Sequence, residues 1–81
     1  MTDKIKRMYN KSVTYSFRSK MIEVLNLNNY KGSWKKCSNE YLIRRLEEEL
    51  EELKTAKNEE DIVKEAIDIA NFAMMIWDNN Y

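Results

Sequence analysis

Four carboxylates stand at matching positions in two segments of the sequence, and their spacing suits metal chemistry. Three positions separate Glu49 from Glu52, and three separate Glu65 from Asp68. Residues three apart are neighbours on the surface of an α-helix, so each segment presents one pair. Glu49 and Glu65 also fall among apolar residues that recur every three or four positions, which predicts that both lie on buried helix seams.

The chemistry follows if the two segments pair as antiparallel helices, because the four carboxylates then converge. Carboxylates so close together repel one another, and removing even one from water is costly. A hard divalent cation offsets that cost, and oxygen ligands without Cys or His favour Mg²⁺, with Mn²⁺ as the second choice. The competing interpretation is a solvated face, because residues 47–52 are mostly glutamate. The paired spacing favours the metal site.

Two helices are predicted to hold these carboxylates. Ser38 is a suitable N-cap for a helix from about Asn39 to Lys57. Asn58 then ends this helix and caps the next, whose first turn is acidic and which runs to about Asp78. The predicted core seams are Leu42, Leu46, Glu49, Leu53 and Ala56 on the first helix, and Glu65, Ile69, Phe72 and Ile76 on the second.

The N-terminal part of the chain predicts a third helix. Residues 1–11 form a basic arm or a frayed helix start, apolar spacing predicts a helix from about Val13 to Leu25, and residues 26–39 form a loop. No segment shows the alternation of a strand. The predicted fold is therefore all-α, with a three-helix protomer whose last two helices form an antiparallel hairpin, in a single domain over residues 1–81.

Composition excludes several other classes of function. The chain has 81 residues, of which 43% are hydrophobic and 35% charged, with no His, one Cys, no Pro and one Gly. These counts exclude internal disulfides, Cys/His zinc sites, His-dependent nucleophilic catalysis and glycine-rich phosphate loops. No apolar segment is long enough to span a membrane or act as a signal peptide. We therefore expect a cytoplasmic protein without a membrane partner.

Charge and apolar surface both suggest partners. Residues 1–36 carry nine Lys/Arg and two Asp/Glu, whereas residues 37–81 carry five and twelve. One interpretation is that the two halves attract each other in the fold. Another is that the acidic half holds a cation while the basic half binds phosphates. Binding of nucleic acid by the basic half is disfavoured, because the acidic half would repel the nucleic-acid backbone. Apolar residues cover over half of the last helix, more than a short chain can bury, which predicts a homo-oligomer. The alternative is that the N-terminal helix wraps around and covers the surplus.

The acidic pattern resembles a known family. Glu49-Leu50-Glu51-Glu52 and Glu65-Ala66-Ile67-Asp68 look like the two-part motif of the MazG-like all-α nucleotide pyrophosphohydrolases, in particular the short stand-alone proteins of bacteria and phages. The resemblance covers about Lys31 to Asn79 and includes Lys31-Gly32-Ser33-Trp34. Glu51 departs from the family, which often has a small residue there.

The resemblance implies a Mg²⁺-dependent hydrolase in the cytoplasm of a bacterium or a phage-infected host. Such an enzyme cleaves a nucleoside triphosphate between the α- and β-phosphates to give a monophosphate and pyrophosphate. Matching positions imply that Glu49, Glu52, Glu65 and Asp68 bind the metal, with Glu49 or Glu48 as the general base. The family favours assemblies in which hairpins form a four-helix bundle, and we expect a tetramer rather than a dimer.

Five further residues are candidates for binding substrate. Lys31 and Lys35 would neutralise phosphates unless they are ordinary loop lysines. Trp34 would stack on a base, although packing on the hairpin core is favoured. Arg45 would contact phosphate, although it stands four residues before Glu49 and a surface salt bridge is favoured. Asn71 would contact metal, sugar or base unless it is solvated. The alternative for the whole chain is a non-catalytic helical module that binds another protein.

Overall fold

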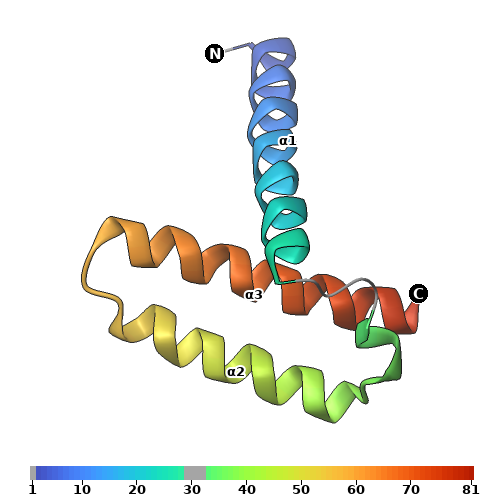
Figure 1. Ribbon diagram of the computed structural model, residues 1–81. Helices are drawn as coiled ribbons and strands as arrows, with labels where there is room; N and C mark the ends of the chain where they lie inside the picture. The colour runs from blue at the N-terminus through green and yellow to red at the C-terminus, as the bar shows by residue number, and fades with distance from the viewer. Residues whose placement is uncertain (1, 29–32) are drawn as a thin grey trace.

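The computed structural model describes residues 2–28 and 33–81, and the fold within them is entirely helical. The elements are α1 (Asp3–Leu27), a short 3₁₀ helix η1 (Ser33–Lys36), α2 (Asn39–Thr55) and α3 (Glu59–Asn80). Figure 1 shows α2 and α3 side by side as an antiparallel hairpin, while α1 stands away from it with only its C-terminal end against α3. The predicted all-α fold with three helices is confirmed. Within the described ranges, no helix is long and apolar enough to cross a membrane.

The two helices of the hairpin begin at the predicted caps. The Ser38 hydroxyl accepts a hydrogen bond from the backbone N–H of Tyr41 at 3.1 Å, and the Asn58 side-chain oxygen accepts one from the N–H of Asp61 at 2.8 Å. Each bond satisfies a backbone donor that has no partner within the helix. The end of α2 is earlier than predicted, at Thr55, because Ala56 adopts an extended conformation and begins a tight connection.

The core lies between α2 and α3 and is small. Leu42, Phe72 and Met75 are buried there, and half-buried side chains, including Leu46 and Trp34, pack against them. The predicted seams are confirmed: on α2 Leu42 and Glu49 are buried, and on α3 Glu65 and Phe72 are buried. The remaining seam residues, Leu46, Leu53, Ala56, Ile69 and Ile76, are half-buried.

Helix α1 differs from the prediction at its start. It begins at Asp3, where Thr2 caps it, instead of near Val13. Of the two alternatives predicted for residues 1–11, the helix start is therefore the one that residues 3–11 adopt. These residues include no Pro or Gly that would break it. None of the side chains of α1 is buried. Its last turns rest on α3, where the side-chain amide of Asn71 donates to the backbone oxygen of Met21 at 3.3 Å.

A polar cluster, which we call the clasp, closes the open end of the hairpin. The indole N–H of Trp34 donates to Asp78 at 2.9 Å, and the Lys35 ammonium lies 2.7 Å from the same carboxylate. Asn39 and Asn80 exchange two side-chain hydrogen bonds. The Lys35 and Trp34 bonds lower the pKa of Asp78. The clasp therefore holds η1 and the start of α2 against the end of α3.

One side of the hairpin remains uncovered in the single chain. On α3, Ile67 and Asn71 are buried, whereas Ile62, Val63 and Trp77 are 45%, 61% and 59% exposed. Helix α1 meets the hairpin only at one end and does not wrap around it (Figure 1). The surplus apolar surface predicted from the sequence is therefore present on the protomer. The alternative prediction, in which the N-terminal helix covers this surface, is wrong.

Candidate metal centre

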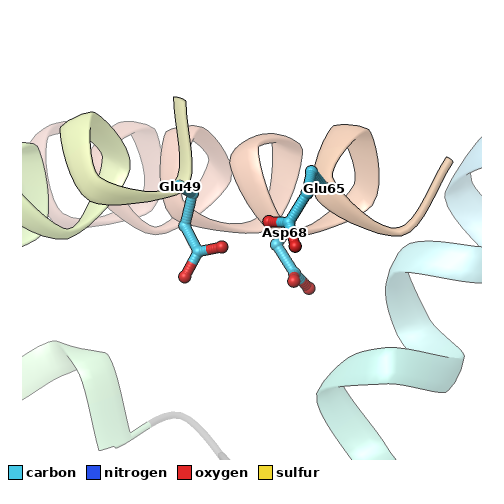
Figure 2. A group of neighbouring side chains, drawn as sticks. All are labelled: Glu49, Glu65 and Asp68. Carbon is cyan, nitrogen blue, oxygen red and sulfur yellow. The ribbon is translucent and has the colours of Figure 1, made fainter. Parts of the chain in front are cut away.

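Three of the four predicted carboxylates meet in the middle of the hairpin. Glu49 projects from α2, Glu65 projects from α3 toward it, and Asp68 lies beside Glu65 on α3 (Figure 2). Oxygen atoms of the three side chains all lie within 4.8 Å of one another. Glu52, one turn beyond Glu49, is exposed and lies outside this group, although its proximity helps to raise the pKa of Glu49.

Two of these carboxylates are taken out of water without full compensation. Glu49 is 6% exposed and Glu65 is 7% exposed. The Oε2 atom of each is buried and has no hydrogen-bond partner. A buried acceptor without a partner costs about 1–3 kcal/mol, and more when it is charged. Unpaired oxygens from facing helices are the donor atoms that a hard cation binds, so the residues present fit Mg²⁺ or Mn²⁺.

Burial and like charge strongly perturb this pair. Burial, together with the neighbouring carboxylates of Glu65 and Glu52, raises the pKa of Glu49 to about 8. Burial also acts to raise the pKa of Glu65, but the hydrogen bonds with Glu49 and Lys64 lower it overall. Neighbouring carboxylates cannot both ionise cheaply, so ionisation of one favours the protonated form of the other. The raised pKa of Glu49 favours its protonated form at neutral pH.

Lys64 supplies an internal counter-charge that the sequence analysis missed. Its ammonium lies 3.2 Å from Glu65 and 2.9 Å from Asp68, while its side chain is 63% exposed. The two ion pairs raise the pKa of Lys64, chiefly through Asp68. The spacing of Lys64 and Asp68, four positions apart, was the available signal. Because the side chain is so exposed, the ammonium can leave the carboxylates when another cation approaches.

A cavity of about 350 Å³ opens beside the carboxylates and beneath the end of α1. Its polar lining includes Glu49, Asp68 and Asn71, and its apolar lining includes Phe72 and Val24. Asn71 is only 2% exposed, and its side-chain oxygen has no hydrogen-bond partner. The cavity therefore joins an anionic wall to an apolar wall that carries one unused acceptor.

The other predicted site residues are distributed over the hairpin. Arg45 forms ion pairs with Glu48 and, at 3.2 Å, with Glu49, and its guanidinium lies over the Phe72 ring, so the favoured salt bridge is confirmed. Glu48 is exposed.

Trp34 and Lys35 lie away from the carboxylates. Trp34 packs on the hairpin core, as favoured, and both residues bind Asp78 in the clasp. At 1.5 Å per residue, Asp78 is about 15 Å along α3 from Asp68, so these two side chains are not gathered at the centre. Lys31 lies outside the described residues.

The fold and centre together define a helical hairpin with a buried acidic cluster. No profile of a known protein family matches the chain, and no match was found among curated proteins or solved structures. The function proposed for this chain therefore depends on its own residues and their geometry.

Proposed function

We propose that this protein is a Mg²⁺-dependent nucleoside triphosphate pyrophosphohydrolase that also accepts Mn²⁺. The supporting observation is the pair of buried carboxylates, Glu49 and Glu65, which face each other across the hairpin with one unpaired oxygen each. Asp68 lies within 4.8 Å of both and completes a set of oxygen ligands. The resemblance of the acidic motif to MazG-like enzymes suggests the reaction class.

Each residue of the centre has a proposed role. Glu49, Glu65 and Asp68 hold the cation, with Glu52 at the edge, and the cation when bound supplies positive charge that polarises a phosphate. Once it has released its proton, Glu49 is also the better placed general base, because Glu48 is exposed and lies outside the group of three carboxylates. Water adds to the α-phosphorus, the bond to the bridging oxygen breaks, and a monophosphate, pyrophosphate and a proton result.

The cavity beside the carboxylates is the proposed nucleoside site. Its volume of about 350 Å³ falls in the range of small-molecule sites. Phe72 and Val24 offer an apolar wall for a base, and the unpaired oxygen of Asn71 offers an acceptor for a base or sugar donor. We place Trp34 and Lys35 outside this site, since both are engaged by Asp78.

The proposed enzyme is a cytoplasmic homo-oligomer, with a tetramer favoured over a dimer. Ile62, Val63 and Trp77 of α3 remain exposed in one chain, and such apolar faces support pairing of hairpins into a four-helix bundle.

A non-catalytic helical interaction module is the alternative function. The same exposed face favours it, and so does Lys64, which partly neutralises the carboxylates without any metal. This alternative predicts that divalent cations change neither stability nor activity.

The decisive experiment measures pyrophosphate release from the eight standard NTPs and dNTPs, with Mg²⁺ and with EDTA. We expect pyrophosphate release with Mg²⁺ and none with EDTA. Glu65→Gln should abolish the release, whereas Glu60→Gln, a control at an exposed position, should leave it unchanged. No release from any nucleotide, together with no metal-induced shift in melting temperature, would support the interaction module.

A further inference from the structure

The outward side of α1 forms a basic and apolar stripe with nothing packed on it. Lys4, Met8, Lys11 and Tyr15 follow one another at spacings of four, three and four, and therefore share one side of the helix. Met8 and Tyr15 are 63% and 67% exposed, and a shallow hollow lies between them. In proteins, most of the stability of a helix comes from packing of its apolar side chains on other elements. A partner surface on this stripe would therefore stabilise α1.

The outward side of α2 forms an acidic stripe at the same spacing. Glu40, Arg44, Glu47 and Glu51 are again separated by four, three and four positions. Leu50, 38% exposed, lies beside them in a shallow hollow. Among the described residues, Glu40 and Glu47 form no ion pair. Glu51 already pairs with Lys54 at 3.1 Å, so the uncompensated negative charge of this stripe lies at Glu40 and Glu47, beside the apolar side chain of Leu50.

The two stripes complement each other but do not meet within one chain. Helix α1 carries six Lys/Arg against two Asp/Glu, whereas α2 carries six Glu against three Lys/Arg. In the described parts of the protomer, α1 packs chiefly on α3, and its backbone does not come close to that of α2. Most of α1 points away from the hairpin (Figure 1). A second copy of the chain is the partner that brings an acidic stripe to this basic one.

We propose that α1 of one copy packs along the outward side of α2 in a second copy. Met8 and Tyr15 then cover Leu50, while Lys4 and Lys11 face Glu47 and Glu51. Because each copy carries both stripes, two copies can make the contact twice and close the assembly. The contact uses neither the carboxylates of the metal centre nor the exposed face of α3, so it stands independently of the proposed activity.

Charge reversal tests this contact, with sedimentation velocity of the full chain as the readout. The double variants Lys4→Glu/Lys11→Glu and Glu47→Lys/Glu51→Lys should each self-associate at least about tenfold more weakly than the wild type. Mixing the two variants should restore the assembly, because each reversed stripe then meets its reversed counterpart. High salt should weaken the wild-type assembly.

A matched control changes the same net charge on the other side of α1. Lys6→Glu/Lys20→Glu should keep the wild-type sedimentation coefficient, and circular dichroism should show wild-type helicity for all variants. A monomeric wild type, a control that dissociates as readily as the stripe variants, or a mixture that fails to reassemble would each overturn the proposal. Assembly that nuclease treatment abolishes would overturn it in favour of nucleic acid as the occupant of α1.

Discussion

Competition between a proton and Mg²⁺ at Glu49 gives the sharpest prediction. Burial and the neighbouring carboxylates of Glu65 and Glu52 raise the pKa of Glu49 to about 8. A carboxyl must release its proton before it binds a cation, so the affinity should rise with pH and level off above this value. Below it, one proton competes with the ion, and the apparent affinity should fall about tenfold for each pH unit, reaching roughly 100-fold at pH 6.

Isothermal titration calorimetry with Mg²⁺ from pH 6 to pH 9 measures this dependence. Repeating the titration at pH 7 in buffers of different ionisation enthalpy counts the protons released, and about one per ion is expected. Glu60→Gln serves as the control, because it removes an exposed carboxylate from the same hairpin and should leave the curve unchanged. An affinity that stays constant between pH 6 and pH 8, with no proton released, would refute the assignment of the proton to Glu49.

Three further predictions concern the same hairpin. Lys64→Gln should tighten Mg²⁺ binding about two- to tenfold, because Mg²⁺ then neither displaces nor is repelled by the Lys64 ammonium. Weaker Mg²⁺ binding, measured by calorimetry, would contradict the role of Lys64 as counter-ion. In the metal-free protein, the pKa of Glu49 in the folded state exceeds its unfolded value of 4.5. The free energy of unfolding, measured with urea, should therefore fall as pH rises from about 5 to 8. Glu49→Gln should make this free energy depend less on pH. Trp34→Phe removes the donor to Asp78 and should cost about 0.5–1.5 kcal/mol of stability, measured by urea unfolding. The same variant should retain Mg²⁺ affinity, and a loss of binding would place Trp34 at the metal centre instead.

Local rules predicted the hairpin well. Ser and Asn are favoured as N-caps where they directly precede an apolar helical pattern. Ser38 and Asn58 both stand at such positions, so the starts of α2 and α3 could be found from the sequence. The placement of Glu49 and Glu65 on the seams followed from helical spacing alone. Antiparallel pairing then brought the two carboxylates together, because a tight connection leaves few other arrangements for two helices.

Tertiary contacts account for what the sequence did not reveal. The burial of Asn71 depends on where α1 crosses α3, and no periodic pattern encodes that crossing. Lys35 was a plausible phosphate ligand until the fold placed Asp78 beside it. The start of α1 was missed because its first residues are largely polar or basic and carry a weak apolar pattern, while the absence of Pro and Gly allows the helix to continue.

The Asn39–Asn80 pair of the clasp also helps to set the register of the hairpin, and with it the spacing between ligands. If α3 slid along α2 by one turn, about 5.4 Å, Glu49 would face Asp61 or Ile69 in place of Glu65. The side-chain pair of Asn39 and Asn80 would then be broken. These uncharged amides lie about 15 Å (Asn39) and about 20 Å (Asn80) along their helices from the carboxylates, yet they help to select which residue stands opposite Glu49. Substitutions at the last turn of α3 would therefore change cation affinity without touching a ligand.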